Sequence, residues 1–237
     1  MANESRPCPC DIGDRFDCEG CGQEVQVEHI KAYICKAAAS TDKAVIVIHD
    51  IFGWQLPNTR YTWLICFQGL GTLVPSAQDF FSGGEAWKPS DDWSEFNDWL
   101  KTRDARKINK EANAALKYLK EQCGAKKLGV VVFCWGGIAA RHLMMTYAEF
   151  RAGVSLYGRV AAWNMALLIQ LLLHSILQVN LLKQKLKKNC KVDYEVNIYP
   201  GQTHGFVHSR REDISPQDKP YIEEGRKDMI RWLNKYI

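Results

Sequence analysis

The chain alternates short apolar runs with longer segments in which apolar residues recur every three or four positions. Residues 44–48 and 127–133 are continuous runs rich in Val and Ile, which is typical of strands buried on both faces of a sheet. Between them, residues 101–122 carry apolar side chains at helical spacing and stop before Gly124, which suits a helix C-cap. Strand, helix and strand in succession predict a mostly parallel, doubly wound α/β sheet.

Other segments extend this pattern in both directions. Residues 24–28 alternate like a half-buried strand that runs on toward Tyr33, and residues 92–99 fit an aromatic-lined loop or lid. The C-terminal half predicts a helix at 137–147, strands at 152–157 and 192–199, and a closing helix from Pro216 onward.

One segment does not fit a parallel sheet. Residues 161–182 are Leu-rich and poor in β-branched side chains, so their propensity favours a helix where a strand is needed. Polar residues within the segment, among them Gln170 and His174, argue against a membrane span, which needs about 20 mostly apolar residues. We therefore expect a missing or damaged strand around 161–182, and with it low stability and a tendency to associate.

Composition is that of a soluble globular protein. The 237 residues, 46% of them hydrophobic and 24% charged, suffice for a single α/β domain spanning 1–237. The net charge of +4 comes from scattered Lys and Arg, so we do not expect nucleic-acid binding. No charged segment followed by an apolar one opens the chain. We expect a cytosolic monomer with reduced thiols that acts on a small molecule and not on a membrane.

Nine cysteines raise the question of a metal site. Zinc modules usually carry two Cys-x-x-Cys hairpins in a small unit of their own, whereas the N-terminal cysteines here precede a strand of a larger domain. We therefore expect neither a metal nor another cofactor. The cysteines concerned are Cys8, Cys10, Cys18 and Cys21.

Candidate chemistry lies where the apolar run 127–133 ends. Cys134 follows directly, and Trp135 and two glycines then open a helical pattern. A nucleophile on such a turn projects from the C-terminal edge of the sheet, where the next backbone N–H groups can hold an oxyanion. His204, in a glycine-flanked loop, is the candidate base, and the order nucleophile then histidine is that of an α/β-hydrolase. A buried core thiol is the alternative interpretation of Cys134.

The same residues predict the state of the thiol. A nearby histidine and a helix N-terminus both favour the thiolate form of a cysteine. Cys134 is therefore predicted to be the thiol that is most readily alkylated in the folded protein.

Three blocks of sequence together resemble the dienelactone hydrolase family. They match it in order, and the resemblance spans nearly the whole chain. It implies an α/β-hydrolase fold and the opening of small enol lactones or esters by Cys134 and His204. It also implies that the backbone N–H groups of Ile51 and Trp135 form the oxyanion hole. The three blocks are residues 45–54, 133–137 and 201–206.

The resemblance also assigns residues around the substrate. In bacterial members the position of Asp50 is a glutamate that keeps the cysteine unreactive until substrate arrives, and a carboxylate that caps the turn after a strand is the other interpretation of Asp50. Arg210 and Arg211 are candidates to pair a substrate carboxylate, or else are solvated surface residues.

The sequence departs from the family pattern at two functional positions. Val132 stands two residues before Cys134, where the turn normally has glycine, and residues 159–192 contain no Asp or Glu to serve as the triad acid. Both departures are expected to slow turnover. Three functions therefore stay open: a cysteine hydrolase of impaired rate, a degenerate relative that only binds ligands, and a thiol-based scavenger of oxidants or electrophiles.

Overall fold

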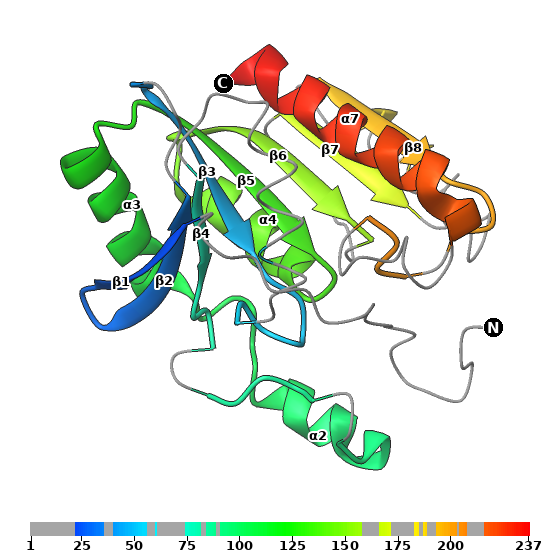
Figure 1. The fold of residues 1–237 in the computed structure, drawn as a ribbon, viewed down its shortest axis with the longest axis horizontal. Helices are drawn as coiled ribbons and strands as arrows, with labels where there is room; N and C mark the ends of the chain where they lie inside the picture. Colours follow the sequence, from blue (N-terminus) through cyan, green and yellow to red (C-terminus); the bar gives the residue numbers. More distant parts are fainter. Residues whose placement is uncertain are drawn as a thin grey trace.

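The central element of the computed structural model is a parallel sheet. Among the described residues, five strands form it in the order β3-β5-β6-β7-β8 (Figure 1). They are β3 Lys43–Ile48, β5 Lys127–Phe133, β6 Phe150–Leu156, β7 Ala166–Leu171 and β8 Tyr194–Ile198. The structure describes residues 22–35, 40–55, 60, 74–81, 84–88, 91–157, 166–171, 183–184, 187–188, 193–202, 204–207 and 216–237.

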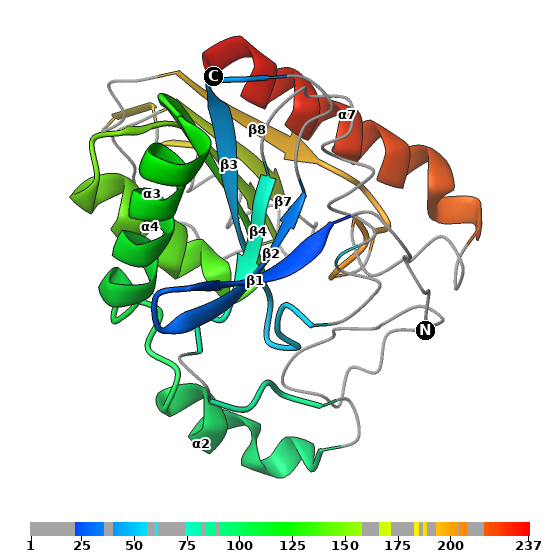
Figure 2. The same cartoon turned by 60° about the vertical axis from the view of Figure 1, so that its left-hand side comes forward.

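Helices cover both faces of this sheet. Figures 1 and 2 show α3 and α4 against one face and α7 against the other. This arrangement confirms the predicted mostly parallel, doubly wound α/β fold. None of the helices in the described part of the chain is both long and apolar enough to cross a lipid bilayer. The three helices are α3 Asn109–Cys123, α4 Gly136–Thr146 and α7 Lys219–Tyr236, the last preceded by the 3₁₀ turn η2 Pro216–Asp218.

The central strands are buried because both of their faces are apolar. In β5, Val130 and Val132 pack toward the α3 and α4 side, and Val131 and Phe133 pack toward α7. The parallel registers pair Ile48 of β3 with Val132, so the carboxyl ends of neighbouring strands finish at the same edge. Residues that follow the strands are thereby brought together at that edge.

A small antiparallel sheet precedes the parallel one. It consists of β1 Gln23–Val27, β2 Ile30–Cys35 and β4 Val74–Gln78, and β4 lies alongside β3. The prediction of one strand running on to Tyr33 is wrong, because Glu28 and His29 form a two-residue turn with Glu28 at φ 52°. The apolar pattern hides this turn, because the buried residues Val27 and Ile30 face each other across it.

The expectation of a missing or damaged strand is wrong for the described part of the segment, because β7 lies there. Residues 166–171 form a strand that pairs in parallel with both β6 and β8, where propensity predicted a helix (Figure 1). The intrinsic helix propensities of ordinary residue types differ by less than about 1 kcal/mol per residue. The pairing of this strand with a neighbour on each side outweighs that difference. The sheet is therefore continuous here. Residues 161–165 and 172–182 lie outside the described part of the chain.

Two further boundaries differ from the predictions. The expected loop or lid at 92–99 contains the 3₁₀ turn η1 Trp93–Glu95, followed by the helix α2 Phe96–Lys101. The Asp92 carboxylate caps η1 and accepts the Ser94 N–H at 2.9 Å. The long helix expected from residue 101 begins only at Asn109. The intervening residues turn around Asp104, whose carboxylate binds the backbone and guanidinium of Arg106.

The end of α3 offers a direct test of the backbone geometry. Gly124 caps the helix at φ 68°, and a Cβ added there would meet nothing within 4 Å. Gly124→Ala should therefore lower the free energy of unfolding by about 1 kcal/mol through backbone strain alone. Urea unfolding measures this, and Gly124→Asn should lose less because Asn tolerates the left-handed region. An equal loss for Ala and Asn would contradict this explanation.

Candidate active site

Cys134 stands on a strained turn between β5 and α4. Its φ is 49°, a left-handed conformation that is uncommon for a residue with a side chain. The Cys134 N–H donates to the Leu156 carbonyl at 3.2 Å, and the Cys134 carbonyl accepts the Gly137 N–H at 3.1 Å. These bonds hold the turn between β6 and the start of α4. Strain of this kind is concentrated at functional sites, where the surrounding structure enforces it.

The turn forms although Val132 occupies the position where glycine was expected. A Cβ added at Gly136 would lie 3.2 Å from the Val132 Cβ and 3.0 Å from the Ile48 Cγ2. The missing side chain at Gly136 therefore makes room for α4 to approach the branched residues of both strands. Val132 is fully buried in this contact. Its expected effect on the rate remains a prediction.

The loop after β3 lies next to this turn. The buried Asp50 carboxylate accepts the Phe52 N–H at 2.9 Å, which is the turn-capping role considered for it. The Ile51 carbonyl accepts the Trp87 N–H at 2.9 Å, and no backbone bond within the described residues uses the Ile51 N–H. The loop places the Ile51 amide beyond the end of β3, at the edge where Cys134 follows β5.

The surroundings of the Cys134 thiol favour its neutral form. Burial raises the pKa of the Cys134 thiol far above its usual value, and the negative charge of Asp50 raises it further. The Trp135 N–H points at the sulfur and opposes this shift only in part. The raised pKa argues against the prediction that Cys134 is the most readily alkylated thiol, and that reactivity stays a prediction. The effect of the Asp50 charge, which raises the pKa of the thiol, agrees with the restraining role that the resemblance implies.

His204 reaches the same edge from a different part of the chain. Its imidazole packs on the ring of Tyr157, with the ring centroids 4.7 Å apart. Tyr157 follows β6 directly and also has a positive φ, 44°. Since β5 and β6 pair Phe133 with Leu156, Cys134 and Tyr157 are the next residues at the end of each strand. The structure therefore places both candidates at the same carboxyl edge of the sheet.

The helix α7 holds the loop that carries His204. Asp228 accepts the Tyr199 hydroxyl at 2.6 Å before the loop, and Arg226 donates to the Val207 carbonyl at 3.1 Å after it. Asp218, just before α7, accepts the Gln202 amide at 3.2 Å within the loop. Sequence reasoning missed these contacts, because charged residues on an amphipathic helix usually indicate a solvated face.

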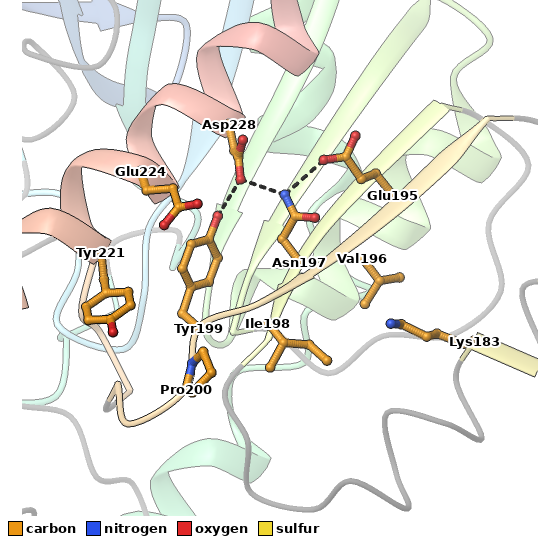
Figure 3. Close-up of a pocket in the computed structure, with 10 residues that line it drawn as sticks. All are labelled: Lys183, Glu195, Val196, Asn197, Ile198, Tyr199, Pro200, Tyr221, Glu224 and Asp228. Atoms are coloured by element: carbon orange, nitrogen blue, oxygen red, sulfur yellow. Dashed lines mark hydrogen bonds between the residues drawn. The ribbon is translucent and has the colours of Figure 1, made fainter.

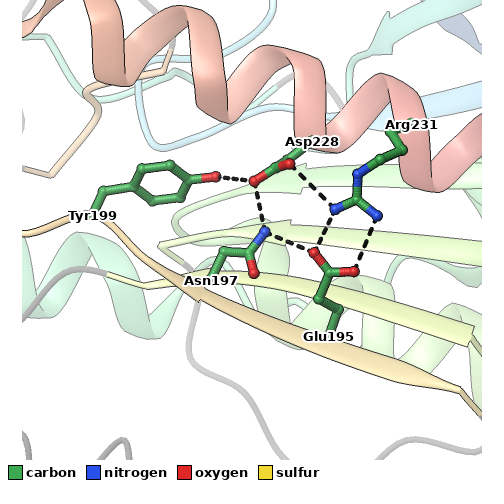
Figure 4. Close-up of polar contacts among 5 residues, drawn as sticks. All are labelled: Glu195, Asn197, Tyr199, Asp228 and Arg231. Atoms are coloured by element: carbon green, nitrogen blue, oxygen red, sulfur yellow. Dashed lines mark hydrogen bonds and ion pairs between the residues drawn. The ribbon is translucent and has the colours of Figure 1, made fainter.

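A polar network extends this attachment to the edge strand β8 (Figure 4). Asn197 donates to Asp228 at 2.6 Å and to Glu195 at 2.9 Å. Arg231 pairs with the Glu195 carboxylate through both of its terminal nitrogens and with Asp228 at 3.2 Å. The charge-assisted bonds hold the pKa of Glu195 below its usual value. The network fixes β8 to α7 and so supports the loop that follows β8.

A pocket of about 550 Å³ opens beside this network (Figure 3). None of the predicted site residues that the structure describes lines it. Its walls come from β8, the start of the His204 loop, α7 and Lys183. The loop and α7 contribute Tyr199, Tyr221, Glu224 and Asp228. The pocket is therefore separate from the edge that carries Cys134.

Several predicted residues cannot be placed. Cys8, Cys10, Cys18, Cys21, Arg210 and Arg211 lie outside the described residues. Within the described part of the chain, no group of three or more His, Cys, Asp or Glu side chains is arranged to hold a metal ion.

His49 is a buried residue of this edge that sequence reasoning missed. Burial lowers the pKa of His49, although the charges of Asp50 and Asp79 oppose the shift. The unfolded chain therefore takes up a proton below about pH 6.5 that the folded protein does not, so stability should fall as the pH drops below that value. Thermal melts between about pH 7.5 and 5.5 should show a larger loss for the parent protein than for His49→Gln. An equal loss in both would show that His49 does not contribute.

The family and several relatives match this chain. The model of the dienelactone hydrolase family matches residues 30–237. The carboxymethylenebutenolidase homologues of Pongo abelii and Homo sapiens are 58% and 57% identical over 248 aligned residues, covering 100% of both chains in each case. A solved dienelactone hydrolase-like promiscuous phosphotriesterase from metagenomic libraries shares the fold at 16% identity. Its TM-score is 0.68, over 91% of this chain and 97% of that one. The chain belongs to the dienelactone hydrolase family.

Proposed function

We propose that the protein hydrolyses small esters and enol lactones of the carboxymethylenebutenolidase type, with Cys134 as nucleophile and His204 as base. The observation that carries this proposal is the strained turn at Cys134, with φ 49°, at the edge where His204 also lies. Backbone strain of this kind is concentrated at functional sites, which favours a functional role over packing alone. The names and identities of the relatives favour the same reaction.

In the proposed reaction His204 takes the proton of the Cys134 thiol as the sulfur attacks the ester carbonyl. The N–H groups of Ile51 and Trp135 bind the oxyanion of the tetrahedral intermediate. The intermediate expels an alcohol that takes its proton from the His204 imidazolium, or an enolate that is protonated after it leaves, so that a thioester remains on Cys134 and His204 is neutral again. An enolate of low basicity needs little protonation in order to leave. Water activated by His204 then hydrolyses the thioester and restores the thiol.

The neutral resting thiol fits this reaction better than general thiol chemistry. A scavenger of oxidants or electrophiles reacts through a standing thiolate, whereas burial and the charge of Asp50 raise the pKa of Cys134. We propose that Asp50 restrains the thiol until a substrate occupies the site. Arg210 and Arg211 are proposed to pair a carboxylate on that substrate. The reaction needs no cofactor.

Trapping the acyl-enzyme tests this function. Mixing the protein with p-nitrophenyl acetate should release a burst of nitrophenolate, and peptide mapping by mass spectrometry should find the acetyl group on Cys134. The control is Cys123→Ala, which removes a partly buried thiol at the end of α3 and should leave the burst intact. Steady release without an acetyl group on Cys134, or ester binding without any release, would reject the proposal.

A further inference from the structure

His49 contacts the residues next to both proposed oxyanion donors: it bonds the Asp50 carbonyl and stacks on the Trp135 ring. It follows β3 directly, is fully buried, and has the rings of Phe81 and Trp135 around it, with centroids 4.5 Å and 5.9 Å away. Its Nδ1 lies 2.7 Å from the carbonyl oxygen of Asp50. A carbonyl oxygen can only accept a hydrogen bond, so Nδ1 carries the proton and donates.

This hydrogen bond orients a catalytic amide. The Asp50 carbonyl and the Ile51 N–H belong to one peptide group, and the described residues contain no cis peptide bond. In a planar trans peptide the C=O and N–H point in opposite directions, so fixing one fixes the other. The Gly53 N–H also donates to the Asp50 carbonyl, at 3.4 Å, so His49 supplies the shorter of the two bonds that set the direction of the Ile51 N–H. The Trp87 N–H, bonded to the Ile51 carbonyl, holds the following peptide in place.

The ring of His49 acts on the second amide through packing. It lies nearly parallel to the Trp135 indole, with an interplanar angle of 9°. The Trp135 Nε1 donates to the Arg103 carbonyl at 2.8 Å, so the indole is fixed on two sides. The backbone N–H of Trp135 is the other proposed oxyanion donor.

We propose that His49 is a positioning residue that aligns both N–H groups of the oxyanion hole, through its bond to the Asp50 carbonyl and its stacking on Trp135. The proposal rests on the hydrolase function proposed above. With Nδ1 protonated, a neutral ring leaves Nε2 as an acceptor, and that atom is buried without a partner in the described structure. Burial lowers the pKa of His49, which keeps the ring neutral and the Nδ1 donor in place.

Two variants separate the hydrogen bond from the packing. His49→Phe keeps an aromatic ring among its aromatic neighbours and removes both the donor and the unpartnered Nε2, so the fold should be retained. His49→Asn places an amide N–H near the position of Nδ1. Each variant is compared with the parent in two reactions of Cys134: acetylation by p-nitrophenyl acetate, which passes through an oxyanion, and alkylation by iodoacetamide, which does not.

The expected result is a split between the two reactions. His49→Phe should lower the acetylation rate about tenfold, with the loss in kcat rather than KM. Removing an oxyanion donor costs about 10²–10³-fold in kcat, and misaligning a donor should cost part of that. Alkylation should stay within about twofold of the parent, and His49→Asn should recover most of the acetylation rate.

Other outcomes overturn the proposal. Unchanged acetylation in His49→Phe, or an equal loss of acetylation and alkylation, would mean that His49 only packs. If His49→Phe does not fold, His49→Gln is used instead, because the glutamine amide lies near the position of Nε2 and not of Nδ1. Equal acetylation rates in His49→Gln and His49→Asn would then reject the proposal. A parent protein that is alkylated but never acetylated would instead reject the hydrolase function itself.

Discussion

Replacing Cys134 by alanine should lower kcat/KM for a small aryl ester by a factor of about 10³ or more. Alanine leaves the turn, the proposed oxyanion donors and His204 in place but removes the sulfur that accepts the acyl group. The remaining groups can then only assist the attack of water, which is a weaker nucleophile. Initial rates with p-nitrophenyl acetate measure the loss.

The matched control for this variant is Cys123→Ala, whose rate should stay within about twofold of the parent because the thiol lies away from the edge of the sheet. His204→Gln should resemble Cys134→Ala, since residues that act as a unit lose their effect together. Equal rates in Cys134→Ala and the parent would show that hydrolysis occurs elsewhere on the protein.

Asp50→Asn is expected to raise the alkylation rate of Cys134 at neutral pH by about tenfold, the effect of lowering the thiol pKa by about one unit. The negative charge of Asp50 raises the pKa of Cys134, and asparagine removes that charge while retaining an oxygen for the Phe52 N–H. Iodoacetamide labelling over a pH series, with peptide mapping, gives both the rate and the apparent pKa.

Asp79→Asn provides a close control. The Asp79 carboxylate also accepts a backbone N–H two residues later, from Phe81 at 3.1 Å, and it influences the pKa of His49 but is not among the groups that shift the pKa of Cys134. The alkylation rate of Cys134 in Asp79→Asn should match that in the parent protein. If Asp50→Asn also leaves the rate unchanged, burial alone keeps the thiol neutral, and Asp50 only caps the turn.

Local pattern was sufficient to predict the strand, turn and helix around Cys134. A run of branched residues that ends in a cysteine and two glycines fixes the conformation within about ten positions, and the structure shows β5, the strained turn and α4 there. The edge shared with His204 also followed from sequence, because parallel strands end together.

The errors came from contacts between distant segments. Residues 166–171 have helix-favouring side chains but hydrogen-bond to strands on both sides, which no local propensity contains. His49 resembled any residue at the end of a buried strand, and only the folded chain places its ring on Trp135. The bonds from Arg226 and Asp228 to the His204 loop likewise join residues 19 and 29 positions apart.

The attachment of the His204 loop to α7 has a consequence for protein synthesis. Because a chain emerges from the ribosome in order, β5, Cys134 and α4 are available to fold before β8 and α7 exist. The thiol is then made well before the helix that holds its proposed base in position. A nascent chain would thus carry the proposed nucleophile before its partner is aligned, and the proposed hydrolysis would become possible only when α7 docks. The proposed activity and the completion of the fold are therefore coupled in time.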